Sequence, residues 1–399
     1  MNTKTESPTE SADKILLYCS ATMFFTLIIT FPLWLSTRVY PLTPLFRSEL
    51  IAATYSYDLI LLVTALCCLI ACNLKELRVT AITLFLFVSL VWWVQDQSRI
   101  VLWYYSILLL FVGLLYTFTA EDEKKAYGLD CCRIIVCGIY LWGGLNKLNP
   151  WFFVEIFPWF MKPFFGAATE SPLFSVLAFG AAFTEGAIGV MLLFPRTRRL
   201  AVVLLTLLHL TILFCLGPLG HSRAIAVWPW NILMMIVSFL LFWNEKDRSA
   251  KEILTPLFPL KWCISFLVFI APALWYVGYW NTHMSFHMYT GLRDNAVYQI
   301  SNEQRVHLPY TVQEVLKENG ELYPADWSMN EFAFTPHQEE RVFFQIGRTL
   351  CYHTQSAGAV RMTVIKRPRV PLTWSKNGEL TENLTHYLPC VSVQKKANG

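Results

Sequence analysis

Three ionisable side chains lie in long apolar stretches of the sequence, where a charge is costly. Glu185 lies near the middle of one stretch, His209 lies in the next, and Lys147 closes an earlier one in LWGGLNKLNPWF. Ionisable residues within membrane-spanning segments are rare and suggest functional sites. A lysine partly removed from water binds its proton less tightly and can act as a general base, while a carboxylate or an imidazole can relay protons. Lys147, His209 and Glu185 are therefore candidate catalytic residues.

Each of these three residues also has a structural interpretation. Glu185 can join two helices through a hydrogen bond, because Ala182 and Gly189 share its helix face and small residues let helices approach closely. A lone histidine on an apolar helix is more often a packing residue than a catalyst. A lysine at the end of a span commonly extends its ammonium to the membrane surface. The sequence leaves both interpretations open.

Polar residues also gather in the turns between apolar stretches, chiefly in the segments DQSR and GHSR and beside the lysine of GGLNKLN. These turns are expected to face one compartment and to form a polar vestibule covered by the C-terminal segment. His283 and His287 lie four residues apart without a third ligand, so no metal site is predicted. The candidate substrate-binding residues are Asp96, Gln97, Arg99, Asn146, His221 and Arg223.

Long apolar segments must position all of these side chains. Of 399 residues, 55% are hydrophobic and 15% are charged, whereas about a quarter of the residues in a soluble protein are charged. The net charge of +4 indicates no nucleic-acid partner. A membrane span needs about 20 mostly apolar residues. Nine segments qualify, approximately residues 15–36, 58–74, 79–94, 100–119, 131–148, 173–194, 200–216, 226–243 and 262–280.

We therefore predict an α-helical polytopic membrane bundle of about nine transmembrane helices with a small α+β C-terminal domain. Residues 1–14 are polar and are expected to be a disordered cytoplasmic N-terminus, and residues 15–281 form the membrane domain. Within it, prolines interrupt the aromatic stretch 150–166, which is typical of an interfacial segment. Residues 282–399 are expected to form the extracytoplasmic domain.

The orientation follows from the basic residues of the loops. With the N-terminus in the cytoplasm, Lys and Arg are about twice as frequent in the inner loops as in the outer ones. An odd number of spans then places the C-terminal domain outside, and a count of eight or ten would reverse that placement. The prediction is a multi-pass integral membrane protein whose partners include membrane lipid.

The C-terminal segment changes in character. AVYQI and RVHLP are predicted to form a hairpin, YTVQEVLKENG a short helix, EERVFFQIGRTLCYH an amphipathic helix, and VRMTVIKRP a strand. Of the eleven cysteines, only Cys351 and Cys390 lie outside the apolar region. They are a candidate disulfide pair in an oxidising compartment.

Several of these segments resemble one family of membrane enzymes. GGLNKLNPWF looks like the glycine–lysine–leucine segment of the vitamin K-dependent gamma-carboxylase and its HTTM-domain relatives. EGAIGVMLLFPRTRRLAVVLLTLLHL resembles both this family and the DoxX-like membrane proteins, and DQSRIVLWYYS is similar to a substrate-side turn of the group. The resemblance implies that Lys147 is the base that deprotonates a vitamin K-like hydroquinone.

The chain also departs from the carboxylase pattern. Asn146 stands where the carboxylase has a second lysine, the DQSR turn lacks a histidine, and a tail of about 120 residues replaces the large lumenal domains. The resemblance therefore implies the architecture more strongly than it implies glutamate carboxylation. Two functions remain open. One is a membrane enzyme acting on a lipid-soluble quinol, and the other is a non-catalytic scaffold or quinone- or lipid-binding subunit that serves a redox partner protein.

Overall fold

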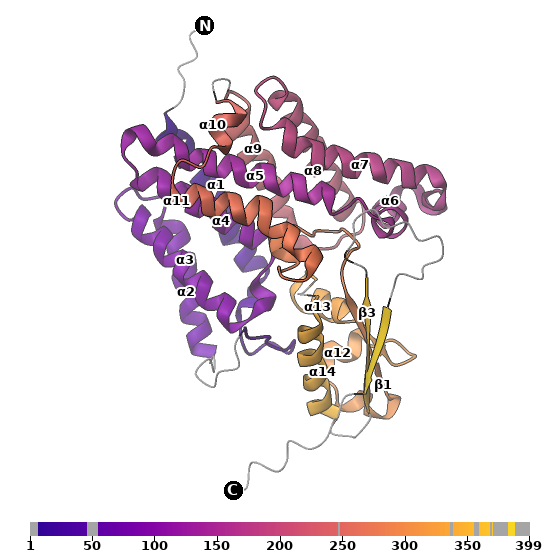
Figure 1. The fold of residues 1–399 in the computed structure, drawn as a ribbon. Coiled ribbons are helices and arrows are strands. Elements are labelled where there is room, and N and C mark those ends of the chain that lie inside the picture. Colours follow the sequence, from indigo (N-terminus) through magenta and orange to yellow (C-terminus); the bar gives the residue numbers. More distant parts are fainter. Residues whose placement is uncertain are drawn as a thin grey trace.

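The computed structural model describes residues 7–45, 55–245, 248–335, 338–354, 359–367, 369 and 382–387. These residues are mostly helical, and a small antiparallel sheet lies near the C-terminus (Figure 1). Within the described residues, eight helices or helical runs are long and apolar enough to cross a membrane. They are α1 (Pro8–Ile29), α3 (Arg78–Gln95), α4 (Leu102–Thr119), a turn with α5 (Asp122–Leu145), α7 (Pro172–Met191), α8 (Arg198–Leu216), a turn with α9 (Ile225–Phe242), and α11 with the turns after it (Pro259–Val277).

The outward faces of these helices are apolar, as expected for a protein that sits in lipid. Phe87, Val176, Phe183 and Leu207 are each more than half exposed. Soluble proteins rarely expose apolar surface on this scale. The predicted helical bundle is therefore confirmed, and its long apolar helices suggest a multi-pass membrane protein, whereas the count of nine spans stays a prediction. A further apolar helix, α2 (Tyr55–Ala71), is shorter than the other eight.

The helices run between two ends of the bundle. At one end, Asp13 near the start of α1 pairs with Arg78 at the start of α3 at 2.7 Å. At the other end, Asp58 near the start of α2 accepts hydrogen bonds from Ser36, which follows α1. The short helix α2 therefore joins the same two ends as its longer neighbours. The C-terminal segment lies at the second end, opposite the start of α1.

Helices α5 and α7 pack unusually closely because glycines face each other along their contact. A Cβ atom on Gly144 would lie 2.1 Å from the backbone nitrogen of Gly186, and one on Gly189 would lie 2.6 Å from the carbonyl of Cys137. No side chain fits at either position without separating the helices. This contact brings the end of α5 beside the middle of α7.

The chain after α5 turns sharply and then forms the aromatic segment predicted to lie at the interface. Asn146 ends α5, and the side chain of Asn149 accepts a hydrogen bond from the amide of Phe152. A π-helical turn (Phe152–Ile156) leads into α6 (Phe157–Phe165). Single π turns inside helices often accompany functional sites.

The C-terminal segment is an α+β unit. The sheet has the order β2 (Glu321–Leu322), β1 (Asn295–Ile300), β3 (Val360–Lys366), β4 (Glu382–Tyr387), and all neighbours are antiparallel. Three helices accompany it, α12 (Tyr310–Val315), α13 (Pro324–Phe332) and α14 (Glu340–Thr354), while α10 (Ala250–Leu254) belongs to the bundle. Figure 1 shows the sheet and α12–α14 together at one end of the bundle.

Most of the secondary structure predicted for this segment is confirmed, with one exception. The amphipathic helix is α14, whose buried face includes Val342, Ile346 and Leu350, and the alternating strand is β3. The predicted hairpin of AVYQI and RVHLP is wrong. AVYQI lies in β1, but RVHLP begins in a short 3-10 helix (Asn302–His307), and β1 pairs with β3 and β2 instead. Strands that pair with partners distant in the sequence leave no local pattern from which the pairing could be predicted.

Candidate functional site

The three candidate catalytic residues line one cavity in the membrane bundle. Lys147, Glu185 and His209 surround a space of about 320 Å³, which we call the inner cavity. Its other walls are mainly apolar and aromatic, and they come from α4 to α9 and from the segment after the last span. They include Leu102, Ile139, Phe152, Phe157, Phe160, Met161, Leu208, Ile212, Phe286, Met288 and Tyr289. An apolar cavity with a few convergent polar groups is the usual form of a small-molecule site.

Lys147 and Glu185 form a close ion pair at the wall of this cavity. The ammonium of Lys147 lies 2.7 Å from both carboxylate oxygens of Glu185. Both side chains are nearly buried, at 11% and 12% exposure. Gly143 makes room for the carboxylate, since a Cβ atom there would lie 2.5 Å from Oε1 of Glu185. The pair therefore holds an exchangeable proton next to apolar space.

His209 is held by two hydrogen bonds from neighbouring helices. Its Nε2 lies 2.6 Å from the hydroxyl of Tyr140 on α5, and its Nδ1 lies 2.7 Å from Oδ1 of Asn231 on α9. The amide of Asn231 donates to the carbonyl of Val227, so its oxygen accepts from Nδ1. In the neutral ring, Nε2 would accept the proton of the Tyr140 hydroxyl. These two contacts hold the ring in a fixed orientation.

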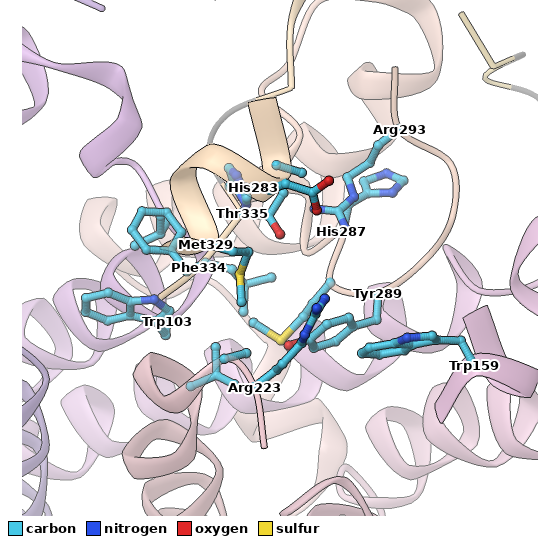
Figure 2. Close-up of a pocket in the computed structure, with 17 residues that line it drawn as sticks. Trp103, Trp159, Arg223, His283, His287, Tyr289, Arg293, Met329, Phe334 and Thr335 are labelled. Atoms are coloured by element: carbon cyan, nitrogen blue, oxygen red, sulfur yellow. The ribbon is translucent and has the colours of Figure 1, made fainter. Parts of the chain in front are cut away.

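A second, more polar space adjoins the inner cavity, and we call it the polar chamber. Its volume is about 190 Å³, and it lies between the end of the bundle and α13 (Figure 2). Arg223, His287 and Arg293 line it, and Asp326 is the one carboxylate among the lining residues that the structure describes. Leu102, Met288 and Tyr289 line both spaces. The two cavities are therefore neighbours that share a wall.

The charges around the polar chamber are predominantly positive. Burial lowers the pKa of His287 far below its ordinary value, and the cations Arg293, Arg369 and Lys147 lower it further. The ring is therefore neutral at physiological pH. Burial also raises the pKa of the Tyr289 hydroxyl to about 12, so this group stays protonated.

The DQSR turn lies elsewhere and has a structural role. Burial alone would raise the pKa of Asp96, but Arg38 and Arg99, with hydrogen bonds from Thr43 and Ser98, hold it below its usual value. Arg99 is fully buried and donates to the backbone carbonyls of residues 33 and 34. Asp96 and Arg99 therefore fasten the loop after α1 to the end of α3.

Gln97, the third residue of this turn proposed to bind substrate, joins the bundle to the C-terminal unit. Its side-chain oxygen accepts from Arg341 on α14, and its amide donates to the carbonyl of Thr43 at 3.1 Å. Gln97 and its neighbours Asp96 and Arg99 are not among the described residues that line either cavity. The structure does not bring these three to the site.

The remaining candidates are divided between support and lining. Asn146 is buried, donates to the carbonyl of Ser285 at 2.7 Å and accepts from the hydroxyl of Tyr276 at 2.7 Å. His221 stacks on Trp159 and lies 2.7 Å from its carbonyl. Both residues position the walls of the two cavities, whereas Arg223 lines the polar chamber directly.

Cys351, one of the two disulfide candidates, is not among the described residues that line either cavity. Cys351 belongs to α14, while Cys390 lies outside the described residues. Their pairing stays a prediction.

Some residues of the site were not identified from the sequence. Tyr140 and Asn231 are polar side chains within apolar spans, which is the same signal that identified His209. Arg293 and Asp326 lie in the C-terminal segment, and only the three-dimensional fold brings them to the end of the bundle.

Comparison of the chain with family models, curated proteins and solved structures finds no match.

Proposed function

We propose that the protein is an integral membrane enzyme that acts on a lipid-soluble quinol in the inner cavity, with Lys147 as general base. The observation that carries the proposal is the convergence of Lys147, Glu185 and His209 on one mainly apolar space. These residues come from three separate helical regions. An apolar ring and chain would fill the space, and its few polar groups would face the hydroxyl that reacts.

The ion pair suggests how the lysine becomes a base. The ammonium of Lys147 gives a proton to Glu185, which leaves a neutral amine and a protonated carboxyl group. Transfer of this kind removes two charges from a poorly solvated site. The amine then accepts the proton of the quinol hydroxyl, so that an O–H bond breaks and an N–H bond forms. His209 is placed to orient the substrate beside this pair. Dioxygen would then take two electrons from the resulting anion. With the proton of the second quinol hydroxyl and the proton held on Lys147, it would leave as hydrogen peroxide, so that the quinone remains and the Lys147 amine is free again.

A non-catalytic function is the alternative, and one observation favours it. The polar groups of the inner cavity already have partners, since Lys147 pairs with Glu185 and both nitrogens of His209 are hydrogen-bonded. Such contacts can serve packing alone. In that case, the protein would be a scaffold or a quinone- or lipid-binding subunit of a redox complex, and it would turn over no substrate.

The proposal includes a definite topology. We propose that α2 also crosses the membrane, because it joins the same two ends of the bundle as α1 and α3. Nine crossings with a cytoplasmic N-terminus would place the C-terminal unit, and the polar chamber beneath it, on the outer side. The excess of basic residues in the inner loops supports this orientation.

Turnover of Lys147 variants tests the catalytic role. Purified protein is supplied with the hydroquinone of a short-chain vitamin K analogue, and quinone formation is followed by chromatography under air. Removing a general base lowers the rate by about 10²–10⁴-fold. Lys147→Arg, which can keep the ion pair but cannot act as a base, is expected to lose as much activity as Lys147→Ala.

Lys162 on α6 provides the matched control, because it is an exposed lysine that does not line the inner cavity among the described residues. Lys162→Ala is expected to retain the wild-type rate. Full turnover by Lys147→Arg would show that this mechanism is wrong. Absence of any turnover in the wild-type protein, with quinone binding retained, would favour the alternative.

A further inference from the structure

The polar chamber contains groups that can bind an anion and that find no hydrogen-bond or ion-pair partner in the described ranges of the chain. Nε2 of His287 is buried and has no hydrogen-bond partner among the residues that the structure describes. The guanidinium groups of Arg223 and Arg293 form no hydrogen bond or ion pair within the described part of the chain. All three residues line the same space (Figure 2). A buried polar atom without a partner needs an explanation, and an absent ligand is one.

The contacts of His287 suit its ring to donate a hydrogen bond rather than to carry a positive charge. Its Nδ1 lies 3.1 Å from the hydroxyl of Thr290, and its ring packs on Trp275 with centroids 3.8 Å apart. When the Thr290 hydroxyl donates to Nδ1, the ring proton lies on Nε2 and can be donated into the chamber. A neutral imidazole can then share an anionic oxygen with a guanidinium.

The charge balance favours an anion as well. Arg293 is half-buried, Arg223 is exposed at the mouth, and the carboxylate of Asp326 is exposed and accessible to water. Arginine is well suited to carboxylates and phosphates because its planar fork donates two parallel hydrogen bonds. A space of about 190 Å³ is large enough for one such group with a few waters.

We propose that the polar chamber binds the carboxylate or phosphate group of a substrate through Arg293, Arg223 and Nε2 of His287. The inference rests on the proposed function, because the shared walls at Leu102, Met288 and Tyr289 place the anionic group next to the inner cavity. The group would belong either to an amphipathic lipid whose chain enters the inner cavity or to a water-soluble co-substrate. Both sources present the same chemistry to the chamber.

Binding of matched long-chain ligands tests this proposal. Radiolabelled oleate and oleyl alcohol differ at the end of the chain, and their affinities for the purified full-length protein in micelles are compared by a proximity assay. The wild type is expected to bind oleate about tenfold or more tightly than the alcohol. Arg293→Gln and Arg223→Gln are expected to lose most of that preference, whereas Arg361→Gln, an exposed arginine on β3, should retain it.

Retained binding of oleyl alcohol shows that each variant is folded, and Arg223, being exposed, can be replaced with little risk to folding. Acetate and inorganic phosphate are added as competitors and are also tested alone by thermal shift. Small anions that displace oleate or bind alone, in a manner dependent on Arg293, indicate a water-soluble ligand. If only the binding of oleate depends on Arg293, the bound anionic group is a lipid headgroup.

The proposal is overturned if no oleate, acetate or phosphate binding depends on Arg293 or Arg223. Because these measurements follow binding and not turnover, such a failure is distinct from a failure of the catalytic proposal. Turnover by Lys147→Arg would contradict the catalytic proposal alone.

Discussion

At the scale of single residues, the proposed chemistry depends on the Lys147–Glu185 pair. Glu185→Gln removes the acceptor for the lysine proton and leaves a buried ammonium without its counter-charge. We expect loss of turnover together with a stability loss of about 3 kcal/mol or more. Unfolding of the purified variant in micelles, measured beside the hydroquinone assay, checks both effects.

A double variant separates the chemical role of the pair from its structural role. Replacing both partners by apolar residues, as in Lys147→Met with Glu185→Leu, removes the charges together and is often nearly neutral for stability. We expect unfolding within about 1 kcal/mol of the wild type, with turnover absent. Wild-type turnover by this stable double variant would remove the pair from the mechanism.

At the scale of elements, two adjacent glycines on α5 have different roles. A Cβ atom on Gly143 would meet the flexible end of Glu185, whereas one on Gly144 would meet the backbone of Gly186. Gly143→Ala should therefore shift the carboxylate and reduce turnover with little loss of stability. Gly144→Ala should separate α5 from α7 and destabilise the protein by about 1–3 kcal/mol. Equal effects of both variants on stability would contradict this assignment.

The turn between α3 and α4 predicts a pH dependence of stability. The pKa of Asp96 is lower in the folded protein than in the unfolded chain, where an aspartate has a pKa of about 3.9. Its stabilisation is therefore complete above about pH 4 and is lost as the pH falls through the folded value. Melting temperatures measured between about pH 3 and 7 should show this acid loss in the wild type and less of it in Asp96→Asn, which should also melt lower at neutral pH.

At the scale of the whole molecule, the two ends of the bundle should face different compartments. Ser222 and Tyr279 are exposed near the C-terminal unit, while Glu121 and Arg196 are exposed at the opposite end. In a background lacking the exposed Cys67 and Cys263, cysteines at the first two positions should react with an impermeant maleimide on intact cells. Cysteines at the other two should react only after permeabilisation. Labelling of both pairs from one side would exclude the proposed topology.

The sequence predicted the helical bundle and singled out three residues that line the inner cavity, but it singled out few of the others. Apolar length identifies spans directly, and an ionisable residue inside a span must face other protein, so Lys147, Glu185 and His209 could be chosen without coordinates. In turns, by contrast, a polar residue is ordinary and indicates nothing about its surroundings. The sequence therefore did not indicate that Asp96 and Arg99 are buried and hold two loops together. The polar chamber depends on Arg293, whose position is set by long-range packing.

We propose above all that the inner cavity holds a lipid-soluble quinone, and the direct test is to locate that ligand. A naphthoquinone carrying a diazirine is photo-crosslinked to the wild-type protein, and the modified peptides are identified by mass spectrometry. We predict adducts on residues that line the inner cavity, such as Phe152, Met161 and Met288, and their loss in the presence of excess unmodified quinone. Adducts confined to the lipid-exposed faces of the helices, unaffected by the competitor, would contradict the account.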